Sequence, residues 1–218
     1  MTIAALRDDL SVSIVGLVTA ITQEFDRVSM HGIRRAILAA QAEGLDLPLV
    51  EAALRPAATN ADYENAWAEA LAHAHVAFGG FDGIAYGDLF LRDIRAYRES
   101  QLRPLGLQPM FPLWGRPTAR LAAEFVDRGF EAYLTCVDTT QLAGSFAGRR
   151  FDHTLLNDLP SAVDPCGERG EFHTCVVAGP IFQRAVSVRC GARVLRDDRF
   201  EYCDFELLRP SRSVEGAA

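Results

Sequence analysis

Short runs of β-branched and apolar residues alternate with longer runs of helical periodicity along the first 137 residues, and this alternation constrains the fold more than any other feature. Strands are predicted at Val12–Thr19, Leu47–Ala52, Gly83–Tyr86 and Phe130–Val137, with a short extended segment at Pro109–Leu113. Strands separated by helices of ten or more residues form right-handed βαβ units. The pattern therefore predicts an α/β fold with a parallel sheet.

The helices between these strands are marked by their apolar spacing and by their ends. They are predicted at Ser29–Glu43, from Thr59 onward, at Leu91–Leu102 and at Thr118–Arg128. Gly44 provides a stop for the first. Thr59 and Asp62 have the spacing of a capping box at the start of the second.

The alternation weakens after Asp138. A helix is predicted at Asp152–Leu159, followed by a turn at Asp164–Gly170 and by antiparallel strands at Glu171–Ala178, Ala185–Val188 and Phe200–Leu207. We therefore divide the chain into an α/β domain (residues 1–137), a smaller mixed α+β lobe (residues 138–210) and a frayed tail (residues 211–218).

Composition excludes several classes of protein. The 218 residues are 49% hydrophobic and 23% charged, which excludes global disorder. A net charge of −7 disfavours a nucleic-acid partner. All 22 basic residues are arginines, so lysine-dependent chemistry is excluded within this chain. The longest apolar run, Ile14–Ile21, is too short to cross a membrane. With no export signal at the start, we expect a cytoplasmic protein with five reduced cysteines.

The segment Asp164–Phe182 carries the densest set of reactive side chains. Gly167 and Gly170 bracket Glu168 in a predicted turn, and Glu171 and His173 then alternate on one face of a strand, roughly 7 Å apart. At that spacing they could act together on one substrate as acid and base or as anchors. The alternative is a charged turn followed by an exposed strand face. If both side chains face a ligand, they should open into one pocket near Asp88.

Two further segments follow predicted strands. Gly87 and Asp88 lie where ligands of open parallel sheets bind, at the carboxyl edge. Asp88 could instead be the N-cap of the next helix. His31 either contacts a ligand or is a polar residue near a helix start. No metal site is predicted, because the cysteine and histidine spacings do not match a zinc motif.

Taken together, several stretches resemble the diphthine–ammonia ligase family of ATP-binding domains, in the PP-loop, adenine-nucleotide α-hydrolase-like (HUP) superfamily. The matching stretches are RVSMHGIR (Arg27–Arg34), YGDLFLRDIRAYRE (Tyr86–Glu99), PLWGR (Pro112–Arg116), GFEAYLTCVD (Gly129–Asp138) and DPCGERGEFHT (Asp164–Thr174). The last is the most specific.

The resemblance implies a Rossmann-like parallel sheet that binds ATP with Mg²⁺, followed by a lobe that binds a carboxylate acceptor. Members join ammonia to that carboxylate through an acyl-adenylate, releasing AMP and pyrophosphate. The residues expected on the nucleotide side are Thr19, Met30, His31, Gly87 and Asp88. Those expected to position the acceptor or ammonia are Glu168, Glu171 and His173. A degenerate binding protein without catalysis is the competing hypothesis, and a partly unstable fragment is a third.

Two departures from the family pattern qualify this resemblance. The family's Ser-Gly-Gly-Lys-Asp-Ser pyrophosphate loop and first strand are missing, and both would precede Met1, so we expect that Met1 is not the natural start. The strands at Val12–Thr19 and Gly83–Tyr86 would then either face each other across a gap or close up, and we expect either arrangement to cost several kcal/mol in stability. The signature ends His173-Thr174 rather than Glu-Thr, which resembles a bacterial branch.

Overall fold

The computed structural model describes residues 1–56 and 58–208 and contains three sheets. The first has the order β2-β1-β3, from Arg27–Val28, Leu17–Thr22 and Leu49–Leu54, and the second pairs β4 (Gly83–Ala85) with β5 (Gln108–Met110). The third has the order β7-β6-β9-β8, from Phe172–Ala178, Glu131–Asp138, Phe200–Leu207 and Val188–Arg196. The predicted tail, residues 211–218, lies outside the described residues.

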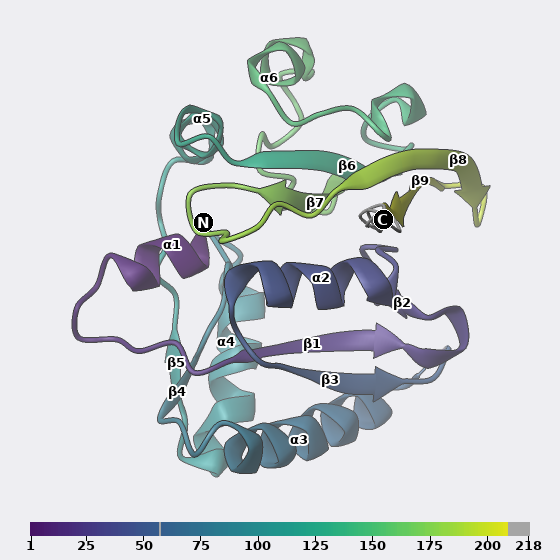
Figure 1. Cartoon of the computed structure of the whole chain (residues 1–218). Helices are drawn as coiled ribbons and strands as arrows, with labels where there is room; N and C mark the ends of the chain where they lie inside the picture. The colour runs from purple at the N-terminus through teal and green to yellow at the C-terminus, as the bar shows by residue number, and fades with distance from the viewer. Residues whose placement is uncertain (57, 209–218) are drawn as a thin grey trace, which may run out of the picture.

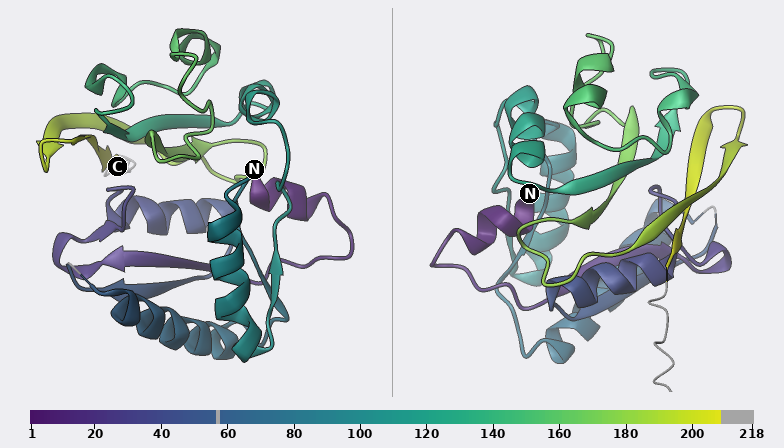
Figure 2. Two further views of the ribbon diagram at one scale, coloured as in Figure 1. Left: turned by 180° about the vertical axis from the view of Figure 1, so that it is seen from behind. Right: turned by 45° about the horizontal axis from the view of Figure 1, so that its top comes forward.

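Six helices surround and separate the sheets in the part of the chain that is described. They are α1 (Thr2–Arg7), α2 (Arg35–Leu45), α3 (Asn60–Ala77), α4 (Arg92–Leu102), α5 (Thr118–Asp127) and α6 (His153–Asp158). Helix α2 lies between the β1–β3 sheet and the antiparallel sheet, whereas α3 covers the opposite face of β1 and β3 (Figures 1 and 2). Helices α5 and α6 cover the outer face of the antiparallel sheet. No described helix is long and apolar enough to cross a membrane.

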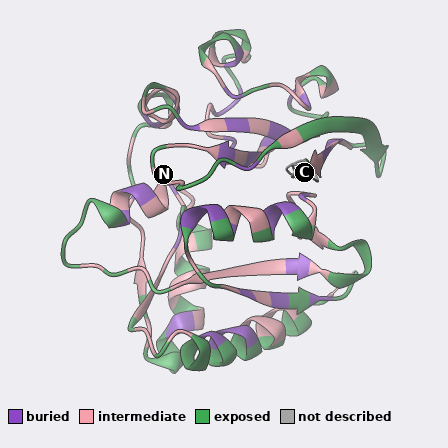
Figure 3. Ribbon diagram, in the orientation of Figure 1, coloured by how far each residue is buried: buried purple, intermediate pink, exposed green. Residues whose placement is uncertain are grey.

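Helix α2 occupies the middle of the molecule because both of its neighbours supply apolar surface. Ile37 is fully buried and belongs to the largest core cluster, together with Leu134 of β6 and Leu155 of α6. A smaller cluster joins β3 to α3 through Val50 and Ala74. The α2 layer therefore connects the two sheets into one packed body, with exposed side chains concentrated on α3, α4 and β8 (Figure 3).

The parallel pattern is confirmed in part. β1 runs parallel to β3, and β4 runs parallel to β5. Among the described residues β1 and β4 belong to separate sheets, and no ladder joins them. The capping box of Thr59 and Asp62 is also confirmed, since each side chain accepts a hydrogen bond from the other residue's backbone N–H.

The structure corrects the prediction for β6. The sequence pattern places Phe130–Val137 in the parallel sheet, whereas β6 runs antiparallel to both β7 and β9. Its neighbours come from the last fifty residues of the chain, which local periodicity could not anticipate. The division of the chain after residue 137 stays a prediction.

Three element boundaries also differ from the prediction. Strand β1 begins at Leu17 rather than Val12, where its register with Leu49 of β3 starts. Helix α2 begins at Arg35 rather than Ser29, because Met30 and Gly32 have left-handed backbones (φ 66° and 68°) that a helix cannot contain. Strand β8 runs over Val188–Arg196 rather than Ala185–Val188, since its conformation comes from pairing with β9.

Candidate functional site

A pair of histidines connects the loop after β2 with strand β7. His31 lies in the turn Ser29–Gly32, and His173 is the second residue of β7. Their ring centroids are 4.6 Å apart with an interplanar angle of 45°. The ring Nδ1 of His31 lies 3.2 Å from the Ser29 carbonyl oxygen, which fixes the orientation of that ring. One histidine predicted on the nucleotide side thus touches one predicted on the acceptor side.

Both histidines are neutral at pH 7. Burial lowers the pKa of His173 to about 4, and the neighbouring His31 lowers it further in the same direction. Burial also lowers the pKa of His31. A neutral imidazole has one donor and one acceptor nitrogen, so each ring can bind a small polar molecule through a hydrogen bond. With a pKa of about 4, His173 is too weak a base to remove a proton from ammonium.

The loop that carries His31 is fixed by an ion-pair cluster that we call the Asp204 cluster, formed by Arg27, Arg34 and Asp204. Asp204 of β9 accepts hydrogen bonds from Arg34 Nε at 3.0 Å and from Arg27 at 2.9 Å. Arg27 also donates to the Gly32 carbonyl oxygen at 2.7 Å. These bonds hold the pKa of Asp204 at about 2, with Arg34 the largest cause. The cluster therefore fastens the first sheet to the antiparallel sheet beside His31.

A close approach between Gly32 and Tyr202 completes this contact. A Cβ on Gly32 would lie 2.7 Å from the Tyr202 ring, so only glycine allows the ring to reach the backbone there. Tyr202 is the register partner of Cys136, and Cys136 is the register partner of His173. These three side chains therefore lie in one row across the sheet that faces the turn.

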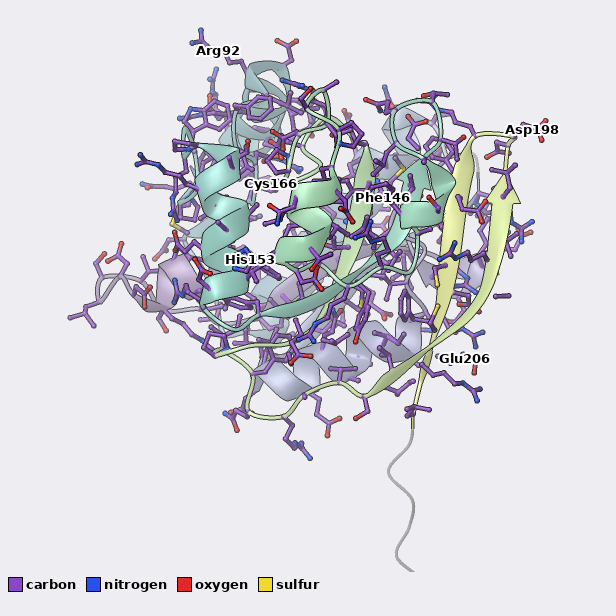
Figure 4. The ribbon with its side chains drawn as sticks, turned by 90° about the horizontal axis from the view of Figure 1, so that it is seen from above. Arg92, Phe146, His153, Cys166, Asp198 and Glu206 are labelled. Carbon is purple, nitrogen blue, oxygen red and sulfur yellow. The ribbon has the colours of Figure 1, made fainter. Side chains whose placement is uncertain are left out.

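Glu171 is buried and stabilises the turn that precedes β7. Its side chain is 1% exposed, and its two carboxylate oxygens accept hydrogen bonds from the N–H groups of Asp164 (2.8 Å) and Arg169 (2.9 Å). Asp164 in turn accepts from the Cys166 N–H. The carboxylates thus stabilise the turn between α6 and β7, and Glu171 does not open into a pocket with His173. Figure 4 labels Cys166 in this turn.

Glu168 reaches from the same turn to the loop after β4. Its Oε1 accepts a hydrogen bond from the Leu89 N–H at 2.7 Å. Burial raises the pKa of Glu168, and the negative charge of Asp88 raises it further. The adjacent Asp88 forms an ion pair with Arg98 of α4, with one contact of 2.6 Å. The structure therefore brings Glu168 beside Asp88 and Gly87, as a second group separate from the histidine pair.

Three backbone N–H groups close to the histidine pair or to Glu168 form no hydrogen bond within the described structure. The N–H groups of Met30, Gly87 and Asp88 donate to no other residue in the described part of the chain. The Met30 side chain is 72% exposed. Thr19 lies in the middle of β1 as the register partner of Glu51, whereas Thr22 at the strand end bonds to Ser29. Free backbone N–H groups in turns and at helix N-termini are typical partners of anions.

Two cavities lie away from the predicted site residues. One cavity of about 560 Å³ lies between α2, β3 and α3, and another of about 660 Å³ lies beside Phe81 and Leu107. Neither contains a predicted site residue. The described residues contain no group of three or more His, Cys, Asp or Glu arranged to hold a metal ion.

Sequence reasoning missed Asp204 and Tyr202, which shape the contact around His31. Both lie on β9 in a run of alternating residues that reads as an ordinary strand. A partial signal was present in RVSMHGIR, because this stretch begins and ends with the two arginines that bind Asp204.

Comparison with known proteins gives matches to one kind of protein. Residues 117–206 match the family described as "Diphthamide synthase C-terminal domain". The chain is 28% identical over 125 residues to a protein of Danio rerio named "Diphthine--ammonia ligase", covering 54% of this chain and 48% of that protein. It is 26% identical over 119 residues to the protein of that name from Rattus norvegicus, covering 52% and 45%. The alignments span about half the length of these relatives.

Proposed function

The chain belongs to the diphthine–ammonia ligase family, with a diphthamide synthase C-terminal domain over residues 117–206, and from this premise we propose that it forms an amide from a carboxylate and ammonia at the expense of ATP. The relatives cover only part of the chain, so the reaction, its substrates and a cytoplasmic location are all part of the proposal. The acceptor is a small-molecule or protein carboxylate.

The contact between His31 and His173 is the observation that supports this proposal most directly. Their rings are 4.6 Å apart although they come from different sheets. An amide ligase must bring an activated carboxylate and ammonia together, and a junction of nucleotide and acceptor sides provides that arrangement. Neutral His173 can hold ammonia by accepting an N–H hydrogen bond while its other nitrogen donates to the acceptor.

The nucleotide side of the proposed site consists of Thr19, Met30, His31, Gly87 and Asp88. The free N–H groups of Met30, Gly87 and Asp88 suit phosphate oxygens. The exposed Met30 thioether offers an apolar surface to a purine ring. Mg²⁺ that is carried on nucleotide phosphates needs few ligands from the protein.

On the acceptor side, we assign Glu168 and Glu171 a positioning role. Glu171 holds the turn before β7, which sets the place of His173. Glu168 connects that turn to the loop carrying Gly87 and Asp88. We propose that these carboxylates align the acceptor lobe with the nucleotide side rather than transfer protons.

A binding protein without catalysis is the second candidate. It is favoured by the engagement of the three carboxylates, since Glu171 and Glu168 accept hydrogen bonds from backbone N–H groups and Asp88 pairs with Arg98. Such a protein would bind nucleotide or carboxylate but release no AMP.

Calorimetric titration of the whole chain with ATP and Mg²⁺ tests the nucleotide side. We expect binding in the wild type and ~10-fold weaker binding in His31→Ala, which corresponds to about 1.4 kcal/mol. His73→Ala, on the exposed face of α3, is the matched control and should bind as the wild type does. No heat at millimolar nucleotide would refute the ligase proposal.

Release of AMP and pyrophosphate tests catalysis. With ammonium and a panel of carboxylates, we expect ammonia-dependent AMP release that His173→Ala abolishes while nucleotide binding remains. Nucleotide binding without AMP release in the wild type would favour the binding protein instead.

A further inference from the structure

Two cysteine thiols face each other on the β8–β9 hairpin, and neither belongs to the histidine pair or to the group around Glu168. The Sγ atoms of Cys190 on β8 and Cys203 on β9 are 2.7 Å apart. Cys190 is exposed, whereas Cys203 is 3% exposed. All five cysteines of the chain are free thiols, and this is the pair for which a thiol–thiol contact is found in the described structure. The hairpin turns at Asp198, which Figure 4 labels at its tip.

A β-bulge lies in β8 next to the thiol pair. Cys190 is the register partner of Phe205 and Arg193 is the register partner of Cys203, so β8 advances three residues while β9 advances two. The additional residue in β8 bends the strand and re-aims the side chains beside it. In this register Cys190 lies diagonally opposite Cys203, two residues away along the ladder, and the bulge begins directly beside it.

A glycine beside the pair leaves room for the two sulfur atoms. Gly148 lies beneath them with φ +83°, and a Cβ there would lie 2.9 Å from the Cys203 Sγ. The other three cysteines lie on different elements: Cys136 on β6, Cys166 in the turn after α6 and Cys175 on β7. The hairpin thus presents one accessible thiol with a second, protected thiol directly behind it.

We propose that Cys190 and Cys203 are a thiol pair that a small disulfide such as oxidised glutathione converts into an intrachain disulfide. The Cys190 thiolate attacks one sulfur of the oxidant, forming a mixed disulfide and expelling one glutathione thiolate. The Cys203 sulfur, as its proton leaves, attacks the Cys190 sulfur and expels the second glutathione. Two protein thiols are oxidised and one disulfide is reduced to two thiols, so atoms and electrons balance.

The order of these steps follows from the environment of each thiol. Cys190 is open to solvent, so a dissolved disulfide can reach it. Burial raises the pKa of Cys203, so this thiol reacts poorly with an external oxidant. Once Cys190 carries glutathione, the short distance between the sulfur atoms favours the intramolecular attack.

The position of Cys203 connects this modification to the rest of the molecule. It lies between Tyr202, which packs on Gly32, and Asp204, which binds Arg27 and Arg34. Oxidation would therefore tie the exposed strand β8 to the strand that joins the two sheets.

Peptide mapping tests the proposal on the whole, native chain. Trypsin cleaves after Arg189, Arg193 and Arg199, so Cys190 and Cys203 fall in different peptides. After incubation with oxidised glutathione and blocking of free thiols, we expect the peptide Cys190–Arg193 to be linked to the peptide that begins at Phe200. The link should disappear on reduction.

Variants separate the two steps. In Cys203→Ser the mixed disulfide should accumulate on Cys190 to more than ~10-fold its level in the wild type, because the intramolecular attack is lost. Cys166→Ser, which removes the half-buried thiol outside the hairpin, should leave the linked peptide unchanged. A wild type in which Cys190 stays free or glutathione-bound, or in which the link forms only in urea, would overturn the proposal.

Discussion

Replacement of Asp204 by asparagine should destabilise the protein through the Asp204 cluster. The cluster lowers the pKa of Asp204 from 3.8 to about 2, which corresponds to about 2.5 kcal/mol at neutral pH. The carboxylate is 20% exposed and its arginine partners are 34% and 41% exposed, so solvent weakens these ion pairs. We therefore expect Asp204→Asn to lower the free energy of unfolding by about 2 kcal/mol at pH 7.

Urea denaturation at pH 7 measures this loss, and an exposed ion pair provides the control. Arg184 and Glu43 lie 3.1 Å apart but are 74% and 70% exposed. Glu43→Gln should therefore cost less than about 0.5 kcal/mol. An equal loss in the two variants would refute the view that the Asp204 cluster, rather than any surface carboxylate, fastens the sheets together.

The pH dependence gives a second, independent check. Because the folded-state pKa of Asp204 is lowered, its contribution is present above pH 3.8 and is lost as the pH falls through about 2. The difference between the wild type and Asp204→Asn should therefore shrink over this range. A difference that stays constant down to pH 2 would contradict the ion-pair origin of the effect.

Three further outcomes are expected. The pKa of His173 falls from 6.5 to about 4 on folding, so protonation should destabilise the folded chain by up to about 3 kcal/mol as the pH falls from 6.5 to 4. In His173→Gln the melting temperature should therefore fall less over this pH range than it does in the wild type. Glu171→Gln should lower the free energy of unfolding by about 1–3 kcal/mol in urea, because an amide oxygen can replace only one of two carboxylate oxygens that accept buried N–H groups; a loss below 0.5 kcal/mol would count against this role. Thr59→Ala should cost about 1 kcal/mol and increase hydrogen exchange in the first turn of α3, whereas unchanged exchange there would show that the capping box contributes little.

Local sequence signals determined much of the secondary structure. The strand at Phe200–Leu207, the capping box at Thr59 and the helix ending at Leu102 agree with the structure, because each depends on residues close together in the chain. The same holds for the turn at Asp164–Gly170, where both glycines have the left-handed backbone that glycine tolerates best. The segment DPCGERGEFHT also carried the family resemblance, which the comparisons bear out.

Tertiary structure alone decided how these elements pair and what surrounds the site residues. β6 has a sequence suited to either kind of sheet, and its antiparallel partners were fixed by strands far along the chain. Glu171 and His173 are two residues apart, yet one is held by backbone N–H groups and the other packs against His31. Periodicity predicts which face a side chain takes, but its role depends on the atoms that surround it in the folded chain. The contact between His31 and His173 joins residues 142 positions apart, so no local pattern encodes it.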